Sequence, residues 1–156
     1  MGLFKWVAGK EKDEEEKLLI DLKKACSLIK KHNRLYKISK GLSVDRIYSG
    51  PWIFDYNGRS TLAKAFNWLK EAQKRVMLLE NKLDSRKALV TYRKNNQLLP
   101  KELRKLKYYS NLNLTLTEDL LPSLRIFVGA RGRDEEKGKI LVEKLERLIN
   151  QFDVII

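Results

Sequence analysis

A regular seam of apolar residues in the middle of the chain constrains the fold more than any other feature. Between residues 62 and 83, apolar side chains recur in alternating steps of three and four. This spacing places them all on one face of an α-helix, as in a helix that packs along its length against other helices. The seam consists of Leu62, Ala65, Leu69, Ala72, Val76, Leu79 and Leu83. We therefore predict a long helix over residues 60–94, although Asp84 and Ser85 could cap a new start within it.

Two further segments have apolar stripes with the period of an amphipathic helix. They predict a first helix over residues 11–39 and a last helix over residues 134–152. Acidic residues gather at the start of the first helix and lysines toward its end, which suits the helix dipole. The stripes are Leu18, Leu22, Ala25, Ile29 and Tyr36 in the first helix, and Leu141, Leu145, Leu148 and Phe152 in the last.

Residues 100–133 give weaker patterns. Pro100 suits the first turn of a short helix. A brief extended piece is predicted where leucines alternate, followed by a short helix capped at Thr117. Gly129 and Gly132 predict a turn, and Asp134 the start of the last helix. The alternating leucines are Leu112, Leu114 and Leu116.

Residues 41–59 break the helical period with Gly50-Pro51 and Asn57-Gly58, while Trp52, Phe54 and Tyr56 alternate as in a strand. The predicted fold is therefore mainly α: a small bundle of three to four main helices with a partly extended aromatic connector at 41–59. A helix-turn-helix over residues 38–49 is a weaker interpretation, because Gly50-Pro51 would end its second helix too early. We expect one domain over residues 1–156, with apolar arms at 1–10 and 153–156.

The residues available for catalysis are few. The chain has one histidine, His32, and one cysteine, Cys26, so a zinc site of the usual ligands cannot form within one chain. Both residues fall in or beside the first helical stripe, and we assign them structural roles. No phosphate-binding loop, dinucleotide fingerprint or nucleophile motif is present. We therefore predict no enzyme activity, catalytic residue, metal or cofactor.

Lone cysteines are typical of reducing compartments, and no apolar run is long enough for a transmembrane helix. We expect a cytoplasmic protein, or one within a virion, that is not secreted. The start of the chain, MGLFKWVAGK, could also touch a membrane surface.

Positive charge is the main functional indication. The chain has 33 Lys and Arg against 20 Asp and Glu, a formal net charge of +13, which favours polyanionic partners. The excess is concentrated in residues 23–40, which contain no acidic residue, and in residues 82–107. Tyrosines that follow the second basic segment could stack on bases. The candidate nucleic-acid-binding residues are Lys23, Lys30, Lys31, Arg34, Lys37, Arg86, Lys87, Arg93, Lys94, Lys101, Arg104, Lys105, Lys107, Tyr108 and Tyr109.

Arg86 and Arg93 occupy the positions where the apolar seam of the 60–94 helix would continue. This substitution of cations for leucines predicts that the helix leaves its own bundle after Leu83. On the first helix, Lys23, Lys30, Arg34 and Lys37 share one flank beside the apolar stripe, with Lys24 and Lys31 further round. Such a flank is either an ordinary solvated surface or a ridge that contacts phosphates.

These patterns favour a non-enzymatic basic helical protein that binds DNA or RNA through the phosphate backbone, as an architectural or virion-type assembly subunit. Homo-oligomers could form through the 60–94 seam or the apolar termini. The alternative is a helical module that binds a protein partner or a membrane surface through the same seam or the N-terminal segment.

Overall fold

The computed structural model describes the backbone of residues 2–40, 59–93 and 100–155, and the side chains of 12–38, 60–86, 100–152 and 154–155. All of its regular structure is helical, which confirms the predicted class. The elements are α1 (Gly2–Lys40), α3 (Arg59–Arg93), α4 (Pro100–Thr115), the π-helix η2 (Leu116–Leu120), α5 (Leu121–Gly129) and α6 (Glu135–Ile155). The connector and most of the proposed helix-turn-helix lie outside the described residues.

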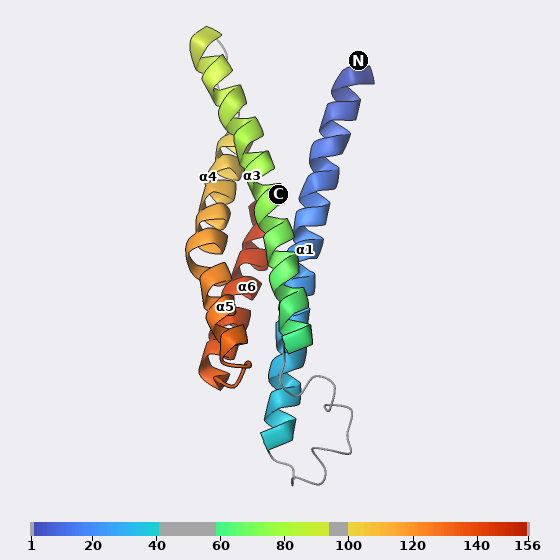
Figure 1. Ribbon diagram of the computed structural model, residues 1–156. Coiled ribbons are helices and arrows are strands. Elements are labelled where there is room, and N and C mark those ends of the chain that lie inside the picture. Colours follow the sequence, from blue (N-terminus) through green and yellow to red (C-terminus); the bar gives the residue numbers. More distant parts are fainter. Residues whose placement is uncertain (1, 41–58, 94–99, 156) are drawn as a thin grey trace.

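The helices form an antiparallel four-helix bundle, in which α4, η2 and α5 together make one rod (Figure 1). α1 packs against α3 and α6, and the α4–α5 rod packs against the same two helices. α1 and α4 therefore lie on the diagonal of the bundle. Because successive helices alternate in direction, the second half of α1 lies at one end of the bundle and the start of α4 at the other (Figure 1).

The three predicted stripes form the core. Every member of the α3 seam is buried, as are Leu18, Leu22, Ala25 and Ile29 of α1 and the four predicted residues of α6. Tyr36 is half-buried at the edge of the α1 stripe. The seam therefore packs inside its own bundle.

The α3 helix continues without a break through Asp84 and Ser85. Its last turns rise beyond the start of α4 (Figure 1). Within the ranges predicted as terminal arms, residues 2–10 belong to α1, which begins at Gly2, and residues 153–155 belong to α6, which ends at Ile155.

The extended piece predicted at residues 112–116 is wrong. α4 is helical to Thr115, and Leu112, Leu116, Leu120 and Leu124 are buried at intervals of four residues. Leu114 is 56% exposed, so the apparent period of two arose from one surface leucine between buried ones.

The helix cap predicted at Thr117 is also wrong. The Thr117 hydroxyl lies within the π-helix and accepts a hydrogen bond of 2.8 Å from Gln73 Nε2. Pro122 lies four residues after Glu118. In a regular α-helix its ring would clash with the Glu118 carbonyl. The wider π turn, closed by Leu121 N–H donating to Leu116 O, lets the rod continue through this proline.

The turn predicted at Gly129–Gly132 is confirmed and has the geometry of a Schellman motif. Gly132 N–H donates to Phe127 O at 2.8 Å and Arg131 N–H to Val128 O at 2.9 Å. Arg131 has φ 59°, at the left-handed position where glycine is usual, and Gly132 has φ 65°. Asp134 caps α6 as predicted, because its Oδ1 accepts a hydrogen bond from Lys137 N–H at 3.1 Å.

Candidate nucleic-acid interface

The basic ridge consists of Lys23, Lys30, Arg34 and Lys37, one flank of the second half of α1. All four side chains are exposed. Lys23 and Lys37 are 14 residues apart, or about 21 Å along an α-helix. The ridge includes no acidic residue, because residues 22–40 contain none. Lys31 lies further round the helix and is also exposed.

A groove runs beside this ridge, between α1 and α6. At its lower end a cavity of about 370 Å³ is lined by Lys30, Asn33, Tyr36 and Lys37 from α1 and by Glu135, Lys139, Val142 and Glu143 from α6. A second hollow continues along the same groove between α1 and α6, past Ser27 and Cys26. The ridge therefore forms one rim of a groove.

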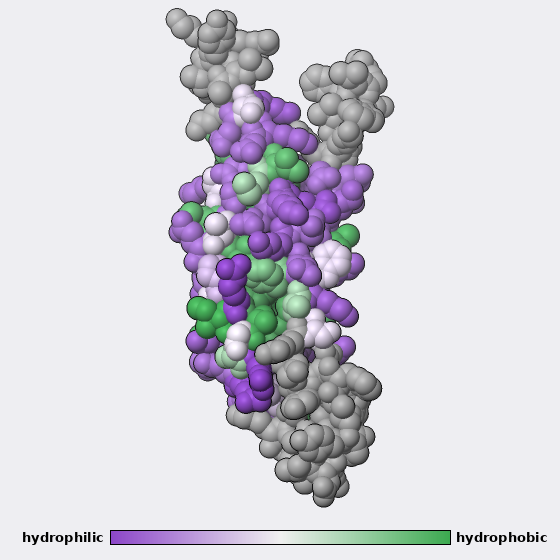
Figure 2. Space-filling model, viewed as in Figure 1, coloured by the Kyte–Doolittle hydropathy of each residue, from purple (hydrophilic) through white to green (hydrophobic). Residues whose placement is uncertain are grey.

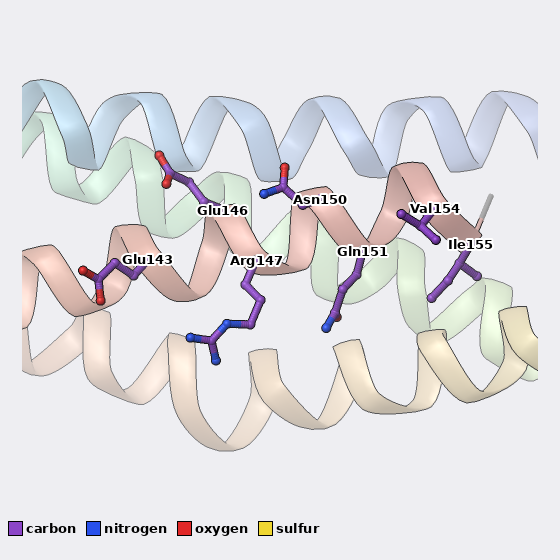
Figure 3. A pocket seen from close by; sticks show the side chains of 7 residues that line it. All are labelled: Glu143, Glu146, Arg147, Asn150, Gln151, Val154 and Ile155. Carbon is purple, nitrogen blue, oxygen red and sulfur yellow. The ribbon is translucent and has the colours of Figure 1, made fainter.

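Lys30 bridges this groove. Its Nζ forms an ion pair with Glu146 of α6, and this hydrogen bond raises the pKa of Lys30 above its ordinary value of 10.5. Further along, an open hollow of about 540 Å³ is lined, among the described side chains, by residues of α6; Glu146 and Asn150 lie on the side of α1 and Arg147 and Gln151 on the side of α4 (Figure 3).

His32 fixes the position of the α5–α6 turn. Its Nε2 lies 2.9 Å from the carbonyl oxygen of Gly132, and because a carbonyl only accepts, Nε2 carries the proton. The ring is buried, stacks on Tyr36 and meets Phe127 edge-on at 5.5 Å. This contact sets the end of α1 against the start of α6, and the predicted structural role of His32 is confirmed.

Glycines allow this close packing. A Cβ on Gly132 would lie 2.5 Å from His32 Cε1 and 2.9 Å from Leu62 Cδ1. A Cβ on Gly138 would overlap Asn33 Oδ1 and lie 3.0 Å from Phe127 Cζ. The Asn33 carboxamide therefore rests against the backbone of α6 at the edge of the cavity.

In the second basic segment, some cations form ion pairs and others are exposed. Arg86 Nη1 pairs with Glu102 at 2.7 Å, and Lys105 Nζ pairs with the buried Glu15 at 2.8 Å. Lys101, Arg104 and Lys107 are exposed on α4. The side chains of Lys87 and Arg93, and all of Lys94, lie outside the described residues.

The predicted base-stacking role of Tyr108 and Tyr109 is wrong, because their side chains are 3% and 1% exposed. Tyr108 OH donates to Leu148 O and Tyr109 OH to Glu15 Oε1, both at 2.8 Å. These inward hydrogen bonds satisfy the hydroxyls and hold α4 against α6 and α1.

The two basic segments do not form one surface. They lie toward opposite ends of the bundle, the first on α1 and the second on the end of α3 and the start of α4 (Figure 1). Sequence reasoning missed Lys139, which lines the cavity opposite Lys37, and the exposed Arg131 and Arg133 of the turn that His32 holds. No sequence pattern indicated them, because they reach this end of the bundle only through the pairing of α1 with α6.

A polar network lies deeper between α1 and α3. Arg75 Nε donates to Asp21 Oδ2 at 2.7 Å, and Arg75 Nη1 donates to Glu14 Oε2 at 3.0 Å. Burial raises the pKa of Asp21 above its ordinary value of 3.8, although Arg75 opposes this effect. Cys26 is buried in the core, as predicted, and this burial raises the pKa of its thiol.

The packing of its helices makes this protein an antiparallel four-helix bundle. Comparison of the chain with protein-family models, curated proteins and solved structures gives no match. Within the described helices, none is both long and apolar enough to cross a membrane. One face of the molecule is largely hydrophilic, with an apolar area in its lower half (Figure 2).

Proposed function

We propose that the protein binds nucleic acid through its phosphate backbone, along the basic ridge of α1. The observation that carries the proposal is the exposed row of Lys23, Lys30, Arg34 and Lys37 on one rigid helix, in a segment without acidic residues. Several cations held in a line contact successive phosphates together, and each contact releases condensed counterions.

The second half of α1 supports this assignment better than the start of α4. Two of the basic side chains near the start of α4, Arg86 and Lys105, form ion pairs with carboxylates, and its two tyrosines are buried. On the ridge, the described ion pair is that of Lys30 with Glu146. The ridge lies in a segment without carboxylates, whereas the second basic segment contains Asp84 and Glu102.

The test compares two charge reversals at opposite ends of the bundle. Lys23→Glu with Arg34→Glu alters the ridge and spares Lys30, whereas Lys101→Glu with Arg104→Glu makes the same change of charge on α4. Binding of a fluorescent oligonucleotide is measured by anisotropy over a range of salt concentrations. We expect the ridge variant to lose about 1.4 to 1.8 units of the slope of log K against log salt, for two phosphate contacts.

The α4 variant controls for net charge and should keep nearly all of the wild-type slope. Equal losses in both variants would show that binding follows overall charge and not the ridge. Absence of binding by the wild-type protein at physiological salt would refute the proposed function itself.

A further inference from the structure

The groove beside the ridge contains two uncharged hydrogen-bond donors, Ser27 of α1 and Asn150 of α6. Both side chains are exposed, and both line the hollow of about 470 Å³ that lies between the two helices. Asn150 lies on the side of α6 that faces α1 (Figure 3). Among the described residues, neither side chain forms a hydrogen bond or an ion pair. Each can therefore donate to a ligand without giving up a contact within the protein.

Two cations of the ridge flank Ser27. Lys23 lies four residues before it and Lys30 three residues after it, so the three side chains are neighbours on one face of α1. Both lysines also line the hollow. A phosphate above Ser27 would lie between two ammonium groups and could accept a hydrogen bond from the hydroxyl. Lysine, serine and asparagine side chains are all common ligands of nucleic-acid phosphates.

The carboxylate of Glu146 lines the hollow too, but its charge is offset by the ion pair with Lys30. Two lysines against one glutamate leave the lining with a net positive charge. Because α1 and α6 run antiparallel, the turn of α6 from Glu146 to Asn150 corresponds to the turn of α1 from Lys30 toward Lys23 (Figure 1). Asn150 therefore lies at the level of Ser27, one turn away from the carboxylate.

We propose that this hollow binds one phosphate of the bound strand through Lys23, Ser27 and Asn150, so that the strand follows the groove between α1 and α6. The inference rests on the proposed function, because the ridge supplies the other phosphate contacts. The alternative path runs along the outer flank of α1, where Lys24 and Lys31 are exposed. A strand on that flank would not contact Asn150, which belongs to α6.

The first test adds one negative charge at either of two neighbouring positions of α6. Asn150→Asp places the charge in the hollow, whereas Gln151→Glu places it on the side of α4 (Figure 3). Binding of a fluorescent DNA oligonucleotide is measured by anisotropy at one salt concentration. Asn150→Asp should weaken binding by about tenfold, because a donor is lost and a carboxylate faces the phosphate. Gln151→Glu should weaken it by less than about twofold.

The second test removes the Ser27 hydroxyl. Alanine favours an α-helix more than serine does, so Ser27→Ala should remain folded. It should weaken binding by about tenfold at every salt concentration, because a hydrogen bond to a charged group is lost. The slope of log K against log salt should not change, since a hydroxyl releases no counterion. Ser85→Ala, at an exposed serine of α3 in the second basic segment, is the control and should bind as the wild type does.

Losses in both Asn150→Asp and Ser27→Ala, with both controls unchanged, would support the phosphate site. Wild-type affinity in Ser27→Ala, or equal losses in Asn150→Asp and Gln151→Glu, would overturn the site while the proposed function stands. Failure of the wild-type protein to bind the oligonucleotide would instead refute the proposed function.

Discussion

Removal of the Arg75 side-chain charge should destabilise the bundle far more than removal of the neighbouring charge of Lys74. Asp21 is 2% exposed, and Arg75 is its ion-pair partner at 2.7 Å. Arg75→Met keeps most of the aliphatic stem but leaves the carboxylate buried and uncompensated. Breaking a buried pair costs about 3–5 kcal/mol, and we expect about 3 kcal/mol because Arg75 is partly exposed. For a chain of this length that lowers the melting temperature by about 6–12 °C.

The loss of stability caused by Arg75→Met should become smaller as the pH falls. Burial already raises the pKa of Asp21, and Lys24 opposes this while Glu71 adds to it. Without Arg75, the pKa of Asp21 in the folded state rises further above the ordinary value of 3.8. A carboxyl whose pKa is raised by folding favours the folded state below its unfolded pKa, and this contribution is lost as the pH rises through the folded pKa. The variant should therefore approach the wild type in acid.

Urea denaturation of both proteins at neutral and acidic pH measures this difference. Lys74→Met is the matched control, because Lys74 pairs with Glu71 at the surface and should change stability by less than about 0.5 kcal/mol. The reasoning is refuted if Arg75→Met costs no more than Lys74→Met, or if its cost is the same at both pH values.

Three further substitutions test the packing at the lower end of the bundle. Gly132→Ala should lower the unfolding free energy by more than about 2 kcal/mol in chemical denaturation, because its φ of 65° and the His32 ring both exclude a Cβ. Gly138→Ala should destabilise by displacing Asn33, and Asn33→Ala in the same chain should recover part of the loss in a double-mutant cycle. Arg131→Gly should raise the melting temperature by a stabilisation of about 1 kcal/mol, since glycine adopts φ 59° without strain; an unchanged temperature would contradict this.

The core was largely predictable from the sequence, because a buried helix face repeats its apolar residues with a fixed period. Leu62 to Leu83 is an example in which every expected residue is buried. The same logic failed at Leu114, since periods of two and four coincide at Leu112 and Leu116 and only the tertiary contacts distinguish them. Short apolar runs of this kind leave helix and strand unresolved.

Only the α1 side of the candidate site was predictable, because all four ridge residues lie on that one helix. Its other wall belongs to α6, and no local pattern indicates that Lys139 lies opposite Lys37. The two tyrosines of α4 look like surface residues beside lysines, but Glu15 and Leu148 supply hydrogen-bond acceptors inside the bundle. Glu15 belongs to the acidic start of α1 and is only 8% exposed. Such pairings depend on which helices are neighbours.

The most direct test of nucleic-acid binding by the ridge is the salt dependence of oligonucleotide binding when the four ridge cations are replaced by glutamine. We predict that the slope of log K against log salt falls by about 2.8 to 3.6 units relative to the wild type, for four lost phosphate contacts. We also predict that Lys101→Gln with Arg104→Gln leaves the slope nearly unchanged. A ridge variant that keeps the wild-type slope would contradict the account.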